Sequence, residues 1–357
     1  MNIAFFESIT SYYVDMHNYL HDNLNFKIYY IYKDFLNHNT EELSKSLNFN
    51  PCFLSSKGKN SFRFKELIRI IKDNRPKNVI TVEFSLLTLQ LIIIKFLYRY
   101  DYNIIVRTDD SIDMLKHSLT IKHKIAKSIM TPMVDNFILC DKKVFDYYQE
   151  KTSKGAYFPI IRDEQKLLKE LDKSQEAGEQ LIIKNNLQNK KIIIFVGRLV
   201  PVKNISAIFK AINRIERDDF IVTIIGDGEL RKELEMEAKD SKHRIIFTGN
   251  LTGIDLLSWY KIANILILPS WQEAFGAVVN EAMVAKCFPI VSERAGSKSL
   301  INNGVNGYIF NPNDDEDLVK AIEFSLEHVK LEKDNNSLMN ITFSECANNI
   351  ANILKKD

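Results

Sequence analysis

Apolar runs that end in glycine constrain the second half of this chain more than any other feature. Ile192–Val196 and Phe220–Ile225 consist of apolar residues with one threonine, and Gly197 and Gly226 follow them directly. Continuous apolar runs of this length are typical of strands buried on both faces of a parallel sheet. Segments with helical periodicity separate the runs, so the pattern predicts a doubly wound α/β domain of alternating strands and helices.

The ends of these runs carry the polar residues that most resemble a binding site. Ligands of doubly wound domains bind outside the carboxyl ends of the strands. Two further runs end at Gly249 and Pro269, so four such ends fall within one stretch of chain. We therefore expect the residues near them to line one crevice, and these residues are Arg198, Lys203, Gly228, Thr248, Glu273 and Glu281.

The segment Pro269–Glu281 places two carboxylates, Glu273 and Glu281, on either side of Phe275-Gly276. A helix that begins at Phe275-Gly276 offers unpaired backbone N–H groups to a phosphate or a sugar hydroxyl. The carboxylates accept hydrogen bonds from ribose and hexose hydroxyls. The alternative is an acidic helix cap followed by an exposed helical glutamate. On this segment alone the two interpretations stay open.

Several short motifs in one order make the prediction more specific. They are Gly197-Arg198-Leu199 with Lys203-Asn204, Gly226-Asp227-Gly228, Phe247-Thr248-Gly249, Glu273-Ala274-Phe275-Gly276 with Glu281-Ala282, Pro289-Ile290-Val291-Ser292, and Asn306-Gly307. Through them, residues 192–310 resemble the donor-binding domain of the family 4 retaining glycosyltransferases. The resemblance implies an α/β protein of the GT-B fold, in which two Rossmann-like doubly wound domains face each other across a cleft. We expect an acceptor-binding domain at 1–165, a nucleotide-sugar donor-binding domain at 166–340, and a terminal helix at 341–357 that crosses back to the first domain.

The resemblance also implies roles for single residues. Arg198 and Lys203 hold the donor diphosphate and stabilise its growing negative charge, and Glu273 binds the donor hexose beside the reacting bond. The remaining donor-binding residues are Gly197, Gly228, Thr248, Phe275, Gly276 and Glu281. The family uses no protein nucleophile, and the cations favour a reaction without a metal or other cofactor on a UDP- or GDP-linked sugar. Alternatively, Arg198 and Lys203 are solvated loop cations and residues 226–228 a plain turn.

The chain departs from the family pattern in places. Ala274 and Lys286 stand where the family often has glycine, which is tolerable where the backbone keeps a negative φ. Gly296-Ser297 keeps part of the usual glycine pair, and Phe158–Asp163 lacks the proline-asparagine-glycine turn that often contacts the donor. We therefore expect the loops at these positions to approach the donor differently.

The first half predicts a second α/β unit, with strands at 2–6, 26–31, 78–82, 103–107 and 136–140. Arg107, Asp109 and Asp110 surround the end of one predicted strand, and Glu83 follows another. Strand ends face the ligand in such folds, so these four residues are candidate acceptor contacts. The alternative for the aspartates is ordinary helix capping.

Charge distribution suggests a partner for the first half. The 357-residue chain has a net charge of only +2, yet residues 56–130 hold 15 Lys and Arg against seven Asp and Glu. Such a region can rest on an anionic membrane surface, whereas the apolar stretch Leu86–Leu97 is too short to span a bilayer. The alternative is a core helix with solvated cations around it. No nucleic-acid-binding module accompanies these cations, so we expect no nucleic-acid partner.

Compartment and function follow from these features. The four cysteines are scattered singly and the N-terminus lacks the pattern of a secretion signal, so we expect a cytoplasmic protein, with the inner face of the membrane as one location. The favoured hypothesis is a retaining glycosyltransferase that moves a sugar from a nucleotide-sugar to a glycan or lipid-linked acceptor in bacterial surface polysaccharide synthesis. The alternatives are a non-catalytic sugar-nucleotide-binding partner of another transferase, and a GT-B epimerase or phosphorylase.

Overall fold

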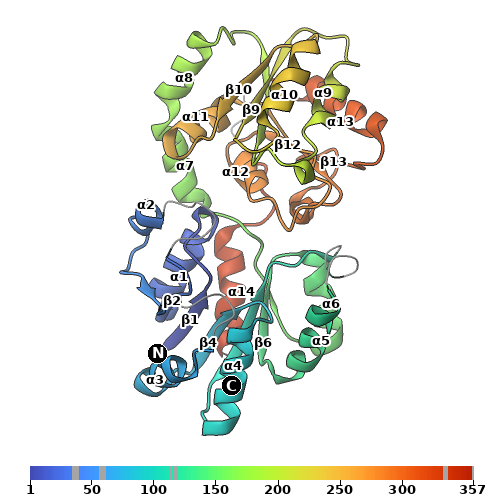
Figure 1. Ribbon diagram of the computed structural model, residues 1–357. Coiled ribbons are helices and arrows are strands. Elements are labelled where there is room, and N and C mark those ends of the chain that lie inside the picture. The colour runs from blue at the N-terminus through green and yellow to red at the C-terminus, as the bar shows by residue number, and fades with distance from the viewer. Residues whose placement is uncertain (34–39, 56–61, 113–114, 116–119, 333–336, 356–357) are drawn as a thin grey trace. The chain divides into compact units, whose positions relative to one another are not determined.

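The computed structural model describes residues 1–33, 40–55, 62–112, 115, 120–332 and 337–355. The chain divides into two compact units, Met1–Arg162 with Phe343–Asp357, and Asp163–Thr342 (Figure 1). Within the expected basic region, Lys57, Lys59, Asp113 and Lys116 lie outside the described residues.

The first unit is built on a seven-stranded sheet in the order β3-β2-β1-β4-β5-β6-β7. All of its strand pairs are parallel. The strands are β1 (Asn2–Phe6), β2 (Phe26–Tyr30), β3 (Cys52–Phe53), β4 (Asn78–Val82), β5 (Asn103–Thr108), β6 (Asn136–Leu139) and β7 (Ala156–Tyr157). The order reverses direction at β1 and β4, so the carboxyl ends of these strands flank a topological switch point.

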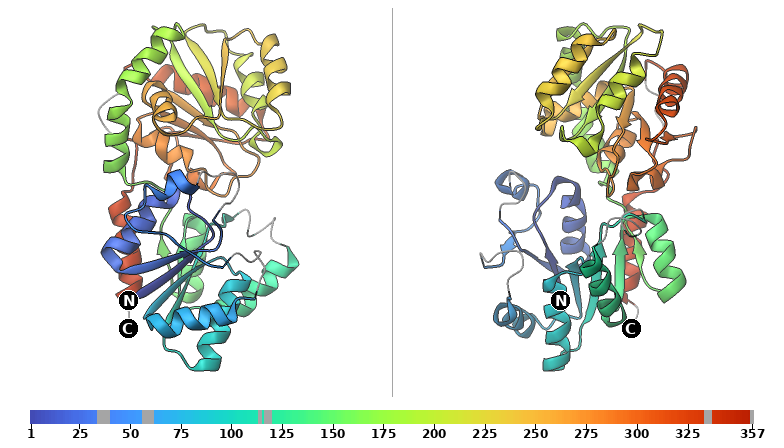
Figure 2. Two further views of the ribbon diagram at one scale, coloured as in Figure 1. Left: turned by 60° about the vertical axis from the view of Figure 1, so that its left-hand side comes forward. Right: turned by 45° about the vertical axis from the view of Figure 1, so that its right-hand side comes forward.

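Helices cover this first sheet. They are η1 (Ser11–Tyr13), α1 (Val14–Leu24), α2 (Thr40–Ser44), α3 (Phe64–Asn74), α4 (Leu86–Tyr98), α5 (Ile121–Met130), η3 (Thr131–Met133), α6 (Lys142–Thr152) and α14 (Phe343–Lys355). Leu67 of α3, Leu91 of α4 and Val144 of α6 share one buried cluster with the strands. The terminal helix α14 packs against β7 and α1, which Figure 2 shows in two further views.

The second unit has a six-stranded parallel sheet in the order β10-β9-β8-β11-β12-β13. Its strands are β8 (Lys191–Val196), β9 (Phe220–Ile225), β10 (Ile245–Gly249), β11 (Ile265–Leu268), β12 (Phe288–Ser292) and β13 (Tyr308–Phe310). Every residue of β9 and β11 is buried, as expected for strands covered on both faces. The predicted fold class of two doubly wound parallel α/β units is therefore confirmed.

Along the chain, the helices of the second unit precede its first strand, lie between its strands, or follow its last strand. They are α7 (Glu164–Lys173), α8 (Gln175–Lys184), η4 (Pro201–Lys203), α9 (Ser206–Ile212), α10 (Arg231–Glu237), η5 (Ala238–Asp240), α11 (Gly253–Ile262), α12 (Val278–Val284), η6 (Gly296–Leu300) and α13 (Asp315–His328). The Asp163 side chain caps α7 by accepting from the backbone N–H groups of Gln165 and Lys166. Both α7 and α8 pack against α11, so the polar stretch that starts the unit belongs to its structure.

Two local features of the second unit differ from what the sequence analysis assumed. The helix expected to begin at Phe275-Gly276 begins at Val278, because Gly276 has a φ of 92° that no right-handed helix accepts. The condition of a negative φ, under which a residue other than glycine is tolerable, is not met at Lys286, whose φ is 61° just after the end of α12. A lysine here occupies the left-handed conformation for which glycine is the usual residue.

The apolar stretch of α4 is part of the core. Leu91 and Ile94 are fully buried, which favours the core-helix alternative for this segment over a lipid contact. Among the helices that the structure describes, none is both long enough and apolar enough to cross a bilayer.

Candidate functional site

The loops after β8, β9 and β10 are joined edge to edge by backbone hydrogen bonds. The Gly197 N–H donates to the Ile225 carbonyl at 3.0 Å, and the Gly226 N–H donates to the Gly249 carbonyl at 2.8 Å. Gly197, Gly226 and Gly249 thus mark one continuous rim at the carboxyl ends of the three strands. Thr248 belongs to this rim, and its hydroxyl donates to the Gly249 carbonyl at 2.9 Å.

Two glycines of this unit are required by close backbone packing. A Cβ on Gly228 would lie 2.5 Å from the Leu199 carbonyl oxygen, and a Cβ on Gly296 would lie 2.2 Å from the Ala274 carbonyl oxygen. Neither distance is possible for a real Cβ without movement of the backbone. Glycine at these two positions lets the loop after β9 contact the loop after β8, and lets η6 contact the segment before α12.

Lys203 and Glu273 come together as an ion pair, although 70 residues separate them in the sequence. The side chains of Lys203 and Glu273 are only 16% and 17% exposed. The pair is held in place by its backbone, since Trp271 N–H donates to the Val202 carbonyl at 2.9 Å. The structure thus brings together two of the three residues predicted to be catalytic, a cation and a carboxylate that each retain a small accessible surface.

Arg198, the third of these residues, sits on the same loop but is exposed. Within the described part of the chain, its guanidinium makes no hydrogen bond or ion pair. An arginine with five unengaged N–H donors suits bidentate contact with a phosphate.

The predicted donor-binding residues around α12 have different surroundings. Phe275 is 1% exposed and anchors its loop in the core, whereas Glu281 is half-buried as the fourth residue of α12. Gly276 is half-buried beside Ser297, whose Oγ would lie 3.1 Å from a Cβ at Gly276. The Ser297 Oγ is buried and has no hydrogen-bond partner among the described residues. The sequence analysis names Ser297 only as part of an incomplete glycine pair and not as a candidate site residue, because a lone serine carries no signal of its own.

In the first unit, Arg107 and Asp109 form an ion pair at the end of β5. The guanidinium carbon of Arg107 lies 3.6 Å from the centre of the Tyr13 ring, and the Tyr13 hydroxyl donates to Asp109 at 2.7 Å. Arg107 is 5% exposed, so its charge is shielded from water and balanced by Asp109. Tyr13 was missed in the sequence because it lies 96 residues from Asp109.

Glu83 and Asp110 form a second charged group beside the first. The Asp109 N–H donates to Glu83 at 3.0 Å, and the Thr108 hydroxyl lies between Glu83 and Asp110 at 3.1 Å and 2.9 Å. Lys127 of α5 forms an ion pair with Asp110. Burial, together with the charges of Asp110 and Asp109, raises the pKa of Glu83 to about 7. Glu83 also has a φ of 58°, an uncommon conformation for a residue with a side chain.

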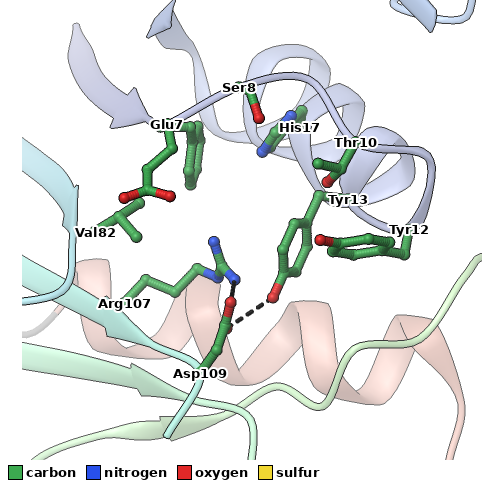
Figure 3. A pocket seen from close by; sticks show the side chains of 10 residues that line it. Glu7, Ser8, Thr10, Tyr12, Tyr13, His17, Val82, Arg107 and Asp109 are labelled. Atoms are coloured by element: carbon green, nitrogen blue, oxygen red, sulfur yellow. Dashed lines mark hydrogen bonds and ion pairs between the residues drawn. The ribbon is translucent and has the colours of Figure 1, made fainter. Parts of the chain in front are cut away.

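The four predicted acceptor residues therefore lie together, and a small cavity adjoins them. Its volume is about 80 Å³, and Figure 3 shows its lining side chains. They are Phe6, Glu7, Ser8, Thr10, Tyr12, Tyr13, His17, Val82, Arg107 and Asp109. Arg107 and Asp109 border the cavity, while Glu83 and Asp110 are outside its lining. Among the described residues, no group of three His, Cys, Asp or Glu side chains is placed to hold a metal ion.

Residues 178–337 match the family described as glycosyl transferases group 1. An uncharacterized glycosyltransferase of Methanocaldococcus jannaschii is 33% identical over 138 residues, which cover 38% of this chain and 35% of the relative. A Campylobacter jejuni alpha-1,4-N-acetyl-D-galactosaminyltransferase, whose name includes a saccharide on PP-undecaprenol, is 28% identical over 44% of each chain. The matched segments thus span between about a third and just under half of the length of these two relatives.

Solved structures extend the likeness in fold to the whole chain. Anabaena HepE in complex with UDP and glucose has a TM-score of 0.70 at 14% identity, and the alignment covers 99% of this chain and 94% of that one. The two doubly wound units therefore define a protein of the GT-B fold. Residues 178–337, in the second unit, carry the similarity to the glycosyl transferases group 1 family.

Proposed function

We propose that this protein is a retaining glycosyltransferase that takes a sugar from a nucleotide-sugar and transfers it to a saccharide acceptor. The observation that carries the proposal is the Lys203–Glu273 ion pair, with the exposed Arg198 on the same loop as Lys203, at the carboxyl ends of the strands in the family-matched unit. The complex of Anabaena HepE with UDP and glucose supports a donor of the same kind, with UDP favoured over GDP as its nucleotide.

Electrostatics supplies the catalysis in this proposal. Arg198 and Lys203 contact the donor diphosphate and stabilise the negative charge that develops as the glycosidic bond breaks. Glu273 orients the Lys203 ammonium and accepts hydrogen bonds from the hexose hydroxyls. Glu281 accepts from the ribose, and the backbone near Gly197, Gly228, Thr248, Phe275 and Gly276 forms the rest of the donor site. The departing diphosphate lies on the same face as the attacking acceptor hydroxyl and takes its proton, so the anomeric configuration is retained.

The first unit binds the acceptor in this proposal, through the group of Arg107, Asp109, Asp110 and Glu83. The name of the Campylobacter relative supports a lipid-linked saccharide as the acceptor class, and bacterial surface polysaccharide synthesis as its setting. In this proposal the protein works at the cytoplasmic face of a membrane.

The helix α5 supports a contact with that membrane. Ile121, Ile125 and Ile129 are 77%, 54% and 56% exposed, and their spacing places them on one face of the helix. Lys122 and Lys124 are exposed beside them. Isoleucines that enter the acyl boundary, flanked by lysines that attract anionic headgroups, are typical of an interfacial helix.

Turnover tests the proposed activity. The purified protein is incubated with UDP- and GDP-sugars and with lipid-linked and free oligosaccharides, and both nucleotide release and product linkage are measured. We expect one donor to be consumed and the product anomer to match the donor by NMR. Donor binding without turnover would favour a non-catalytic partner, and an absorbance band of pyridoxal phosphate would favour a phosphorylase.

Vesicle sedimentation tests the membrane contact. We expect the protein to sediment with vesicles that contain phosphatidylglycerol, and we expect Ile125→Asp to weaken this at least tenfold. Ile183→Asp is the matched control, because Ile183 is a 68% exposed isoleucine of the second unit. Equal sedimentation of all three proteins would contradict a role for α5.

A further inference from the structure

The cavity in the first unit is lined by a buried side chain to which the proposed function assigns no role. His17 lies on α1 and is fully buried. Its ring packs against Phe6 with 4.1 Å between ring centres, and its Nδ1 lies 3.0 Å from the Tyr30 hydroxyl. In Figure 3 the ring reaches from α1 toward the space that Ser8, Tyr13 and Arg107 border.

The second ring nitrogen of His17 is unsatisfied. Its Nε2 is buried and has no hydrogen-bond partner among the described residues. Burial, followed by the nearby Arg107 charge, holds the pKa of His17 well below its ordinary value, so the ring is neutral. An unpaired polar atom in a protein interior costs about 1–3 kcal/mol, and such atoms are uncommon. A partner that enters the cavity from outside removes this cost.

The charges around the cavity select the kind of partner. Asp109 neutralises Arg107, and the carboxylate of Glu7 also lines the space, so the lining does not favour an anion. Besides the carboxylates of Glu7 and Asp109, the polar lining consists of hydroxyl groups, the imidazole and the remaining guanidinium N–H groups, while the rings of Tyr12 and Tyr13 supply flat apolar surfaces. A ligand with hydroxyl groups on a ring that has apolar faces matches both the polar groups and the aromatic surfaces of this lining.

We propose that this cavity is a subsite for a neutral sugar residue, in which His17 Nε2 hydrogen-bonds to a sugar hydroxyl. A hydroxyl both donates and accepts, so it satisfies Nε2 in either tautomer of the ring. The volume of about 80 Å³ is several times the space of about 10–15 Å³ that one water molecule requires. The inference rests on the proposed function and deepens it, because it assigns the acceptor sugar to named residues of the first unit.

The test observes His17 directly. The full-length protein is labelled with ¹⁵N-histidine, and the Nε2 signal of His17 is assigned by its loss in His17→Phe. Methyl glycosides of glucose, galactose, mannose and N-acetylglucosamine are titrated into the high millimolar range, with inorganic phosphate as an anionic probe. We expect at least one glycoside to shift the His17 Nε2 signal with saturation, and phosphate to leave it unchanged. Donor hydrolysis is measured on the same sample.

Two variants keep the test independent of folding. Ser8→Ala removes one hydroxyl that lines the cavity and leaves His17 and its Tyr30 contact in place, so we expect about three- to tenfold weaker glycoside binding. His21→Gln alters a histidine of the same helix that does not line the cavity, and we expect unchanged binding.

Each outcome decides the inference. A His17 signal that no glycoside moves, or that phosphate alone moves, overturns the sugar subsite, and a cavity filled only by water is then the better description. If the sugar subsite is overturned in this way but the protein still hydrolyses the donor, the proposed transferase activity stands and only the subsite fails. Glycoside binding without any donor turnover keeps the subsite and removes the activity.

Discussion

The two units share one architecture but hold their polar groups in different ways. In the second unit the rim of the sheet is formed by backbone contacts between loops, and Arg198 remains exposed above it. In the first unit the charged residues at the same end of the sheet are paired, as Arg107 is with Asp109 and Lys127 with Asp110, and Arg107 and Asp110 are buried. We infer that the second unit is built to admit a charged ligand. The first unit, by contrast, holds paired charged side chains beside a small cavity, and the lining of this cavity has carboxylates at Glu7 and Asp109 and a guanidinium at Arg107.

Removal of the Lys203 ammonium in the second unit is expected to have the largest effect. We expect Lys203→Ala to lower transferase activity by about 10²–10³-fold, because the substitution removes a cation that stabilises negative charge in the transition state. It also leaves Glu273 without its ion-pair partner. Lys210→Ala, on the helix that follows, is the control. Sugar release from the nucleotide-sugar measures the effect, and activity within threefold of wild type would refute the assignment of Lys203 to the diphosphate.

Lys127 provides the corresponding test in the first unit. The side chains of Lys127 and Asp110 are 13% and 9% exposed, so Lys127→Met leaves a buried carboxylate without its cation. We expect the free energy of unfolding of this unit to fall by about 3 kcal/mol. Hydrogen exchange of β4 and β5 measures it, with the exposed Lys124→Met as control. Equal protection in both variants would mean that the pair contributes nothing.

The pH dependence of stability is expected to differ between the units. The pKa of Glu83 is raised from 4.5 to about 7, so the folded state binds more protons than the unfolded state between these values. The stability of the first unit therefore falls as pH rises from about 4.5 to about 7, by at most about 1.4 kcal/mol per pH unit. Glu83→Gln removes this slope. Hydrogen exchange of β4 across this range checks the sign, and a slope that survives in Glu83→Gln would assign it to other groups.

The smallest expected effect is a gain of stability in the second unit. Lys286 has a φ of 61°, where glycine lacks the steric penalty of a side chain. We expect Lys286→Gly to raise the free energy of unfolding by about 0.5–1 kcal/mol, after the entropy of the added glycine is subtracted. Both tryptophans, Trp259 and Trp271, lie in the second unit, so their fluorescence reports its melting. A lower midpoint in Lys286→Gly would show that the lysine side chain contributes more than its strained backbone costs.

The parts of the molecule that the sequence predicts are those that depend on short-range rules. Continuous apolar runs identify the buried strands, and glycine at Gly228 reflects a backbone contact that no other residue permits. Helical spacing alone does not distinguish the exposed isoleucines of α5 from the buried core residues of α4. The two helices differ in burial, and burial depends on the tertiary fold.

Contacts between distant segments account for what the sequence does not predict. The Arg107–Tyr13 stack and the cavity beside His17 join residues that only the strand order β2-β1-β4-β5 brings together. The start of α12 was misplaced because Gly276 takes a positive φ, and a letter in the sequence does not give that angle. The pKa of Glu83 likewise depends on Asp109 and Asp110, which approach it through the pairing of β4 with β5.

Thermal unfolding with a panel of nucleotide-sugars tests whether the second unit has a donor site. The wild type and Glu281→Ala are compared through tryptophan fluorescence, which follows the second unit. A donor at about 100 times its dissociation constant adds about 2.7 kcal/mol to the folded state. We predict that one nucleotide-sugar raises the midpoint of the wild type and raises that of Glu281→Ala much less. No shift with any nucleotide-sugar, or an equal shift in both proteins, would contradict a donor site at the carboxyl ends of β8, β9 and β10.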